Sequence, residues 1–288
     1  YCTMAVEPKT KADVDKMSMA LTRITEEDPS LTLSRSQDTG ETLLSGLGDS
    51  HLEVTMERIR RKLGADLELH TPKVAYKETI TSTVRAEYKH KKQSGGHGQY
   101  GHVFLRLEPL ERGEGFRFAS EIVGGAVPKE YIPAVEKGVL KAMQDGVITG
   151  HPLVDVGAII YDGSYHDVDS SGICYEIAGS NALRKGAAEA NPQLLEPIYK
   201  LTVTVPDSYT GEIIGDLNGK RGKVVGMTPL DGQTVIEAEA PQSELLKYAT
   251  DMRSMTQGRG SFVVEYSHYE GVPVHITQKV IENTQKNK

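Results

Sequence analysis

The chain has 288 residues and a net charge of −7, from 33 basic and 40 acidic side chains. Its hydrophobic content of 38% suffices for packed cores and excludes a wholly disordered chain, and no apolar run reaches the about 20 residues of a membrane-spanning helix. Two cysteines, Cys2 and Cys174, are too few for a disulfide framework, so a cytoplasmic protein is expected. The length predicts two or three domains. The first residues show no signal-peptide pattern, and because the chain opens with Tyr1 rather than methionine we expect a fragment.

The first 71 residues have the pattern strand–helix–strand–strand–helix–strand. Strands are expected near residues 3–6, 31–36, 41–45 and 66–70, with a first helix over 11–23. The second helix carries one apolar stripe, made of Leu52, Met56, Ile59 and Leu63. Gly64 is expected to end this helix. The order predicts a ferredoxin-like domain.

The same order returns over residues 199–267. Leu201, Val203 and Val205 alternate with threonines, as in a half-buried strand. Thr210 is expected to cap a short helix, and Ser243 to open a second one. Further strands are expected near residues 223–227, 233–240 and 261–266. The sequence therefore predicts a second ferredoxin-like domain, followed by a polar helix over 276–285.

The middle of the chain, residues 74–195, has a different pattern. Two alternating segments predict strands, and a helix from Ile132 to Met143 is expected to end at Gly146. A mostly apolar strand over 153–160 and a helix over 174–189 follow. The pattern predicts a central α+β domain, and prolines at positions 72 and 197 mark plausible boundaries. The predicted domains are residues 1–73, 74–196 and 197–288.

A glycine-rich segment, QSGGHGQYG at residues 93–101, lies between two predicted strands. Its glycines allow a positive φ and a close approach of the backbone to a partner. Lys91 and Lys92 just before it suit phosphate groups, and its polar and aromatic residues suit nucleotides. The segment is equally typical of a long hairpin loop with a solvated basic flank, so both interpretations stay open.

The segment YDGSYHDVDSS at residues 161–171 precedes a predicted helix and has three interpretations. His166, Asp167 and Asp169 could serve a metal-dependent hydrolase, although adjacent residues of an extended segment point in opposite directions. The aspartates and serines could instead cap the helix. Alternatively, Tyr165 and His166 form an exposed tip that reads bases or ribose, because the carboxylates would repel phosphate.

Other chemistry has little support in the sequence. No G-x-x-x-x-G-K-[ST] motif occurs, and NGKRGK at 218–223 lacks its spacing, so the chain is not expected to hydrolyse a nucleoside triphosphate. No G-x-S-x-G motif occurs, Cys174 is expected as a small buried hydrophobe, and His51 as a packing or capping residue. Basic side chains of the last domain suit either solvent or an RNA backbone: Lys220, Arg221, Lys223, Arg253 and Arg259.

Five segments together resemble the C-terminal half of bacterial translation elongation factor G: GGHGQYGHV, YDGSYHDVDSS, LLEPIYKLTVTVP, DLNGKRGKVVGM and MTQGRGSFVVEYSHYEGVP. SGLGDSHLEV at residues 45–54 resembles the SGMGELHLEV of that family. The resemblance extends from about Met4 to Val280. It implies the third to fifth domains of the factor: two ferredoxin-like βαββαβ domains flanking a central α+β domain with a left-handed-crossover, ribosomal-protein-like fold.

The resemblance implies ribosome binding and promotion of tRNA–mRNA translocation by a chain that is not itself an enzyme. GTP and Mg²⁺ would be bound by a GTPase domain elsewhere in the parent protein. The implied partners of a monomer are the small-subunit decoding centre, large-subunit RNA, the stalk-base protein, tRNA and mRNA, with no membrane. The tip loops would contact RNA through Gly95, Gly96, His97, Gln99, Ser164, Tyr165 and His166. Weaker RNA contacts of the last domain would be Lys220, Arg221, Lys223 and Arg259.

Two departures from the family pattern stand out. His97 replaces the usual arginine of GGRGQYG and loses a permanent cation, and Asp49-Ser50 replaces the usual Glu-Leu. These departures indicate a paralogue of the main factor. Ribosome recycling and ribosome protection are therefore alternative functions to translocation.

Overall fold

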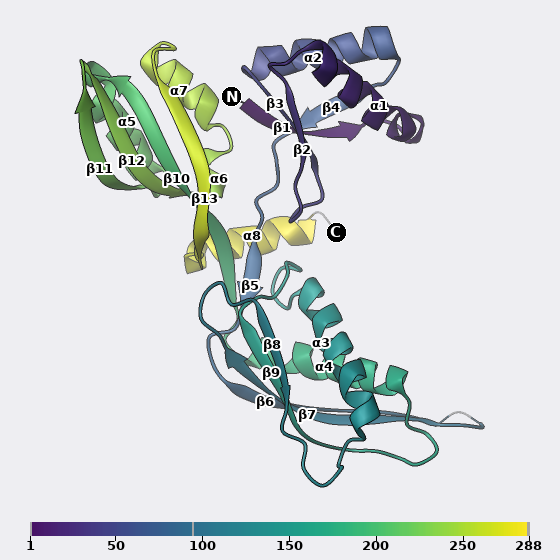
Figure 1. The fold of residues 1–288 in the computed structure, drawn as a ribbon. Coiled ribbons are helices and arrows are strands. Elements are labelled where there is room, and N and C mark those ends of the chain that lie inside the picture. Colours follow the sequence, from purple (N-terminus) through teal and green to yellow (C-terminus); the bar gives the residue numbers. More distant parts are fainter. Residues whose placement is uncertain (1, 94, 287–288) are drawn as a thin grey trace. The chain divides into compact units, whose positions relative to one another are not determined.

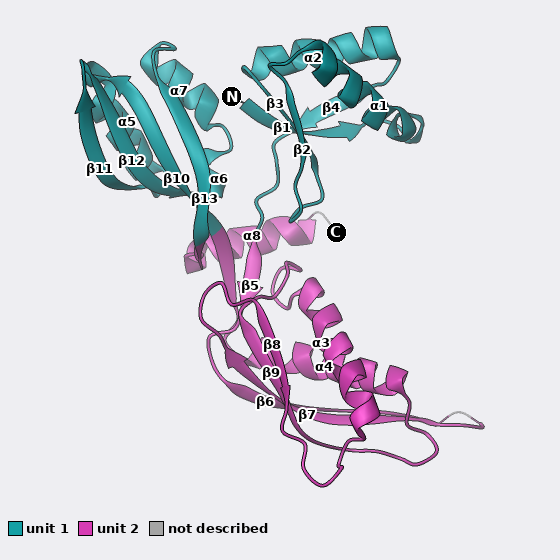
Figure 2. Cartoon of the chain, viewed as in Figure 1, with its two compact units in different colours: residues 1–75, 197–268 teal, residues 76–196, 269–288 magenta. Residues whose placement is uncertain are grey.

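The computed structural model describes residues 2–93 and 95–286 and shows an α+β protein with three sheets (Figure 1). The chain forms two compact units (Figure 2). Unit 1 contains residues 1–75 and 197–268, and unit 2 contains residues 76–196 and 269–288. The chain therefore passes between the units three times, at residues 75–76, 196–197 and 268–269.

The first lobe of unit 1 is the predicted βαββαβ fold. Its elements are β1 (Cys2–Pro8), α1 (Lys11–Glu27), β2 (Thr32–Arg35), β3 (Thr42–Gly46), α2 (Asp49–Leu63) and β4 (Leu67–His70). The antiparallel sheet has the order β2-β3-β1-β4, the ferredoxin-like arrangement. The apolar stripe of α2 lies in the core, and Gly64 ends the helix with a φ of 65°.

The second lobe of unit 1 repeats this topology. Its elements are β10 (Gln193–Pro206), the 3₁₀ turn η2 (Asp207–Tyr209), α5 (Thr210–Gly219), β11 (Lys223–Leu230), β12 (Gln233–Pro241), α6 (Gln242–Leu245), α7 (Tyr248–Thr256) and β13 (Ser261–Gly271). The sheet order β11-β12-β10-β13 matches that of the first lobe. Two local predictions are wrong. Thr210 is the first residue of α5, and its buried hydroxyl has no hydrogen-bond partner among the described residues, while the single helix expected after Ser243 is divided into α6 and α7.

Unit 2 has a mixed sheet covered by two helices. Its elements are β5 (Lys77–Thr79), β6 (Val84–Lys92), β7 (Gln99–Pro109), β8 (Phe116–Ser120), η1 (Lys129–Tyr131), α3 (Ile132–Asp145), β9 (Val156–Ser164), α4 (Gly172–Glu189) and α8 (Val274–Lys286). The order is β6-β7-β9-β8, in which α3 connects the parallel neighbours β8 and β9. Inward side chains of the sheet pack with α3 and α4 in one core.

The strand β9 begins three residues later than predicted. Asp155, just before it, has a φ of 60° and is only 2% exposed. Its carboxylate accepts hydrogen bonds from Gly113 N (3.1 Å), Gly115 N (2.9 Å) and the Arg112 guanidinium (3.1 Å). The apolar segment is therefore broken at Asp155, which holds the loop between β7 and β8 instead of extending the strand.

The C-terminal helix α8 belongs to unit 2, whereas the sequence-based division places it in the last domain. Val272, just before α8, is buried, and its N–H donates to Leu194 O (2.9 Å). Lys77 lies over the ring of Tyr269, 4.5 Å from its centroid. These contacts attach the end of the chain to β5 and the first residues of β10.

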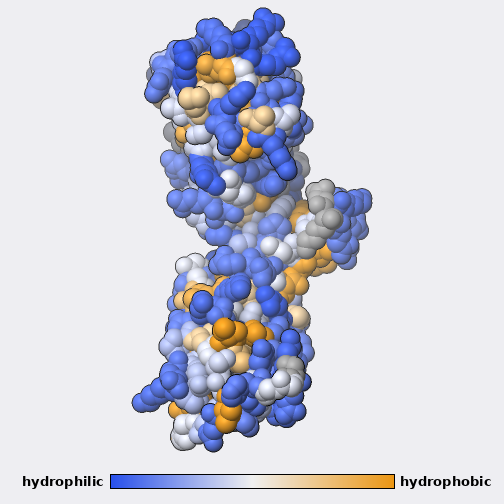
Figure 3. All heavy atoms as spheres, turned by 90° about the vertical axis from the view of Figure 1, so that its right-hand side faces the viewer, coloured by the Kyte–Doolittle hydropathy of each residue, from blue (hydrophilic) through white to orange (hydrophobic). Residues whose placement is uncertain are grey.

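The surface is mostly polar. On the face shown in Figure 3, apolar surface occurs as small patches between hydrophilic residues. No helix within the described part of the chain is long and apolar enough to cross a membrane.

Candidate nucleic-acid interface

Two loops of unit 2 are joined into one surface, which we call the tip: residues 93 and 95–98 between β6 and β7, and residues 165–171 between β9 and α4. Asp169 links them, because its carboxylate accepts a hydrogen bond from Gly98 N (2.9 Å) and its carbonyl accepts one from Tyr100 N (2.9 Å). Tyr100 and Ser170 also form a parallel bridge. The two segments singled out in the sequence therefore belong to one site.

The glycines of the first loop have different roles. A Cβ at Gly98 would lie 2.8 Å from an Asp169 carboxylate oxygen, and one at Gly101 would lie 2.6 Å from Cys174 O. Gly101 is therefore needed for close packing against backbone, and Gly98 leaves the room in which the Asp169 carboxylate lies. Gly96 has a φ of 139°, and a Cβ at Gly95 would meet no atom within 4 Å. Gly95 and Gly96 are the exposed members, as a contact with a partner requires.

The His166 ring closes its own loop and presents one nitrogen to solvent. Nδ1 accepts hydrogen bonds from Val168 N (3.3 Å) and Asp169 N (3.2 Å), so the proton of the neutral ring lies on Nε2. Nδ1 also lies 3.5 Å from an Asp169 carboxylate oxygen. An ion pair between them requires a proton on Nδ1, and a protonated Nδ1 can no longer accept the two backbone hydrogen bonds. With a side chain that is 53% exposed, His166 offers an Nε2–H donor to a ligand.

Ser164 is engaged within the protein. Its hydroxyl lies 2.6 Å from Tyr100 OH and 2.7 Å from His102 Nδ1, and His102 Nε2 lies 2.6 Å from a Glu87 carboxylate oxygen. A carboxylate only accepts, so in the neutral ring Nε2 donates to Glu87, Nδ1 accepts from Ser164, and Ser164 accepts from Tyr100. This relay holds the base of the tip, and the geometry supports a positioning role for Ser164.

The other predicted contact residues are exposed. Tyr165 is 49% exposed, and His97 lies in the exposed part of the first loop. Gln99 is exposed as well, but its Oε1 is hydrogen-bonded to His90 Nε2 (2.8 Å). His90, which the sequence places in the basic flank, is only 7% exposed because strand alternation turns it toward the covered face of the sheet. The exposed lysines of that flank are Lys89, Lys91 and Lys92.

The other two interpretations of residues 161–171 find no support in the geometry. No group of three or more His, Cys, Asp or Glu side chains within residues 2–93 and 95–286 is placed to hold a metal ion. Ser171 occupies the N-cap position of α4 but makes no capping hydrogen bond, and its hydroxyl lies 3.1 Å from Cys174 Sγ. Cys174 is buried, as predicted.

The basic residues of the last lobe fall into two groups. Lys220 donates to Asp216 (2.7 Å) and lies 3.1 Å from Asp251. Burial by itself would lower the Lys220 pKa, but these hydrogen bonds outweigh it and raise the pKa. Arg221 has a φ of 55° and donates to Ser243 (3.2 Å). Lys223 and Arg259 are exposed and suit an RNA backbone better than the two engaged residues.

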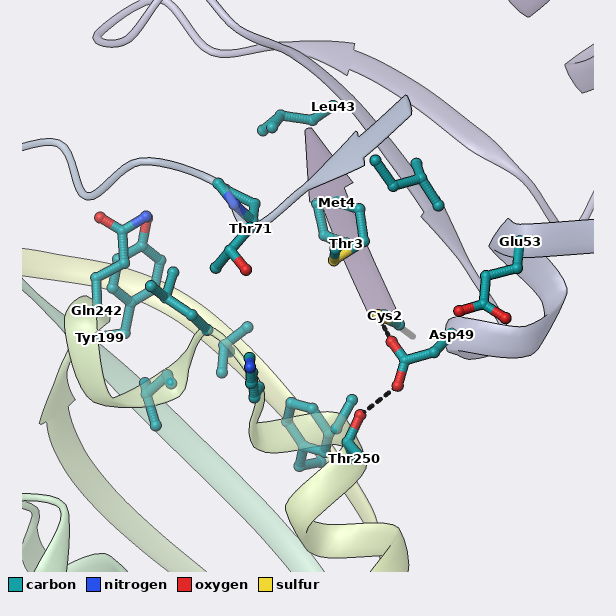
Figure 4. A pocket seen from close by; sticks show the side chains of 18 residues that line it. Cys2, Thr3, Met4, Leu43, Asp49, Glu53, Thr71, Tyr199, Gln242 and Thr250 are labelled. Atoms are coloured by element: carbon teal, nitrogen blue, oxygen red, sulfur yellow. Dashed lines mark hydrogen bonds between the residues drawn. The ribbon is translucent and has the colours of Figure 1, made fainter. Parts of the chain in front are cut away.

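A pocket of about 670 Å³ lies within unit 1, between its two lobes (Figure 4). Asp49, at the start of α2, accepts hydrogen bonds there from Cys2 Sγ (2.9 Å) and Thr250 Oγ1 (2.6 Å), and Arg253 donates to Leu47 O (2.7 Å). Burial, and then the hydrogen bond to Asp49, raise the pKa of Cys2 to about 12, so its thiol stays protonated. The departure at Asp49 thus joins the two lobes. His51 Nδ1 accepts from Leu47 N (3.1 Å), which lies before the N-cap residue Gly48, so the ring holds the loop that precedes α2.

Sequence reasoning missed the roles of Tyr100, His102 and Asp169 as the framework beneath the tip. The available signal was the alternation of Tyr100, His102 and Phe104 along β7, which places three rings on one face of the strand. Partners so distant along the chain, such as Ser164 and Glu87, are not visible in a local pattern.

Comparison with known families accounts for nearly the whole chain. Residues 1–71 match the model of elongation factor G domain III, residues 72–191 that of domain IV, and residues 193–280 that of the elongation factor G C-terminus. These matches comprise no GTPase domain.

A crystal structure of a protein from Thermus thermophilus is similar to the chain, with a TM-score of 0.87 and 42% sequence identity over 99% of this chain. The chain spans 43% of the length of that protein. Three consecutive domain matches, together with the two ferredoxin-like lobes and the α+β unit between them in sequence, show that the chain belongs to the elongation factor G family.

Proposed function

We propose that this chain is the ribosome-binding part of an elongation factor G-like translational GTPase, and that the tip of unit 2 contacts tRNA or small-subunit RNA at the decoding centre during tRNA–mRNA movement. The observation that carries the proposal is the joining of two distant loops by Asp169. The joined loops present Tyr165, His166 and His97 on an internally hydrogen-bonded base.

The chemistry of the tip suits bases and ribose. Tyr165 offers an exposed ring for stacking, and His166 offers a hydrogen-bond donor at Nε2. One carboxylate of the acidic loop, that of Asp169, accepts a hydrogen bond from Gly98 N and is only 20% exposed, so it is less accessible to an RNA. Lys91 and Lys92, exposed at the end of β6, supply the phosphate contacts that the second loop does not favour.

The remaining parts of the chain have supporting roles in the proposal. Lys223 and Arg259 of the last lobe, more than Lys220 and Arg221, would face large-subunit RNA beside the stalk-base protein. The first lobe would relay the nucleotide state. GTP and Mg²⁺ would be bound by the GTPase domain of the parent protein, outside the three domains matched here. The chain would act as a monomer in the cytoplasm.

A recycling or ribosome-protection paralogue is a second candidate, favoured by His97 at the position of the family's arginine. His97 is exposed, so the substitution removes a permanent cation from the contact surface itself. Replacing His97 with arginine in the full-length factor should raise translocation activity if the parent is a specialised paralogue. Unchanged activity would favour the main translocase role.

Ribosome pelleting at low and physiological salt tests the ribosomal proposal. The wild-type chain should pellet in a salt-sensitive manner, and the Tyr165→Ala/His166→Ala variant should pellet about tenfold more weakly. Leu140→Ala is a matched control, because it removes an exposed apolar side chain from α3 of the same unit. Equal pelleting of the tip variant and the wild type would contradict the tip assignment.

A negative result with the isolated chain has a defined follow-up. The full-length factor with a non-hydrolysable GTP analogue should then pellet, and its tip variant should slow tRNA–mRNA movement without changing intrinsic GTP hydrolysis. Absence of ribosome binding by the full-length protein would overturn the proposal.

A further inference from the structure

The sheet of unit 2 has one covered face and one partly exposed face. Helix α4 packs on β6 and β7 from one side, and the buried alternate residues of these strands point into that core. The intervening residues point to the other side. Across the pair of strands, Arg85, Lys89 and Lys91 lie opposite Arg106, His102 and Tyr100 in the register. This second face, which we call the open face, begins at the tip and continues along the sheet.

Aromatic rings form a row on the open face. The ring centroids of His102 and Phe104 are 4.9 Å apart, and those of Phe104 and Tyr161 are 6.0 Å apart. Toward the tip, Tyr100 and His166 have centroids 6.1 Å apart. Phe104 and Tyr161 are only partly buried, although an aromatic ring gains most from full burial. The row therefore connects the tip to rings that lie farther along the sheet.

These rings lie on the two central strands. Tyr100, His102 and Phe104 belong to β7 and Tyr161 to β9, and the sheet order is β6-β7-β9-β8. Tyr161 lies on this side by strand alternation, two residues after Ile159, which pairs with Arg106. The register shift that follows, where Leu105 pairs with Ile160 and Phe104 with Asp162, gives Tyr161 no partner of its own on β7. Aromatic side chains on a four-stranded sheet can stack with two or three unpaired RNA bases.

Cations accompany the rings. The Arg85 guanidinium lies 5.5 Å from the Tyr161 ring centroid, and Lys89 Nζ lies 5.5 Å from that of Tyr100. Lys91 is exposed beside them, and Glu87, the acidic residue between them on β6, is engaged by His102. The guanidinium of Arg106 is hydrogen-bonded to Glu108 and Glu121 and is held in place by them. The β6 edge of the row is thus basic, which complements a phosphate backbone.

We propose that the open face, through Phe104 and Tyr161 with Arg85 and Lys89, is a stacking platform for single-stranded RNA that continues from the tip. Bases would lie on the two rings, and the cations of β6 would follow the phosphates. The proposal extends the RNA contact of the proposed function from the loops to the sheet and rests on that function for the identity of the RNA. A protein partner on the same face is the competing outcome of the test.

The direct test is binding of a fluorescein-labelled unstructured oligouridylate to the 288-residue chain, measured by anisotropy at several salt concentrations. Phe104→Leu keeps an apolar side chain on the strand but removes the ring, and it should weaken binding about tenfold. Arg85→Gln/Lys89→Gln should reduce the slope of log K against log salt by about 0.7 for each phosphate that is no longer neutralised. Leu140→Ala is the control and should bind like the wild type.

Photo-crosslinking locates the RNA without a substitution. An oligouridylate containing 4-thiouridine should crosslink to peptides that contain Phe104 or Tyr161. Crosslinks confined to residues 95–97 and 165–166, or wild-type affinity of Phe104→Leu, would overturn the platform. Absence of oligouridylate binding by the wild-type chain would overturn it as well.

The two proposals fail in different ways. If ribosome pelleting depends on Tyr165 and His166 while oligouridylate binding does not depend on Phe104, the platform fails and the tip assignment stands. If the full-length factor does not bind ribosomes while oligouridylate binding depends on Phe104, the ribosomal function fails and the platform stands. If Phe104→Leu weakens ribosome pelleting but not oligouridylate binding, a protein surface occupies the open face and the RNA platform is wrong.

Discussion

Neighbouring glycines of one motif serve different physical purposes at the tip. Gly98 and Gly101 leave room for Asp169 and for the backbone at Cys174, whereas Gly95 has free space around it. A glycine-rich sequence pattern does not distinguish a position that has no room for a Cβ from a position where a larger residue would fit. The distinction requires the positions of Asp169 and Cys174, which lie about 70 residues farther along the chain than the glycines that they contact.

This difference predicts effects of different size for two alanine substitutions. Gly101→Ala should lower the free energy of unfolding by about 2 kcal/mol, because its Cβ would lie 2.6 Å from a backbone oxygen that cannot move independently. Gly95→Ala should change it by less than about 0.5 kcal/mol. Urea denaturation measures both, and equal effects would contradict the packing role of Gly101.

Asp28 gives the first lobe a specific acid sensitivity. Hydrogen bonds from Ser30, and then from His51 (3.0 Å), lower the pKa of Asp28 from 3.8 to about 2. A carboxyl group with a lower pKa in the folded state stabilises the fold above the unfolded pKa, and this contribution is lost as the pH falls toward the folded pKa. Asp28→Asn should therefore reduce the loss of stability between about pH 5 and pH 2. Thermal unfolding across that range measures it, with Asp15→Asn, an exposed residue of α1, as the control.

At the scale of the element, a buried carboxylate connects β5 to the loop after α3. Glu78 is fully buried and accepts hydrogen bonds from Val147 N (2.6 Å), Ile148 N (3.0 Å) and Thr149 N (2.6 Å), directly after α3. The N–H groups of this loop thus bind a carboxylate from a distant strand. Gly146, at a φ of 62°, leaves the space that the carboxylate occupies.

Replacing this carboxylate should destabilise unit 2. Glu78→Gln puts an amide donor among three backbone donors, and it should cost about 3 kcal/mol of unfolding free energy. Glu189→Gln, at the exposed end of α4, is the matched control and should be neutral. Urea denaturation compares the two variants, and a neutral Glu78→Gln would show that the loop does not depend on the charge.

Long periodic helices and strands were predictable from the sequence, but the hydrogen bonds that connect them to distant loops were not. The stripe of α2 and the alternation of β10 follow from burial of one face, so both βαββαβ lobes are confirmed. The break at Asp155 depends on donors from Gly113 and Gly115, and a local apolar pattern carries no information on them. In the site, the two loops were predicted from the sequence. The hydrogen bond between them through Asp169 and the burial of His90 could not be predicted without the structure of the sheet.

At the scale of the whole molecule, each unit has cores of its own. One core belongs to unit 2, and each lobe of unit 1 has another. Domains with separate cores commonly unfold in separate steps, and two-state behaviour is then not expected. The chain passes from one unit to the other at three places only, within β10, within β13 and in the connection before β5.

Calorimetry should therefore resolve more than one unfolding transition. Glu78→Gln should lower the transition of unit 2, and Asp28→Asn at low pH should affect the transition that includes the first lobe of unit 1. A single transition that both substitutions shift together would contradict independent unfolding. The tryptophan-free sequence makes calorimetry preferable to intrinsic fluorescence for this comparison.

The triple passage of the chain between the units has a consequence for biosynthesis. The first lobe is complete once residue 75 has left the ribosome, but unit 2 lacks its last segment until the codons for residues 269–288 have been translated. Val272 is buried, and its N–H donates to Leu194 O. Unit 2 therefore lacks this contact for as long as the second lobe is being synthesised. Premature termination just before the codon for Val272 would thus deprive the middle of the chain, rather than only the residues that are missing, of a native contact.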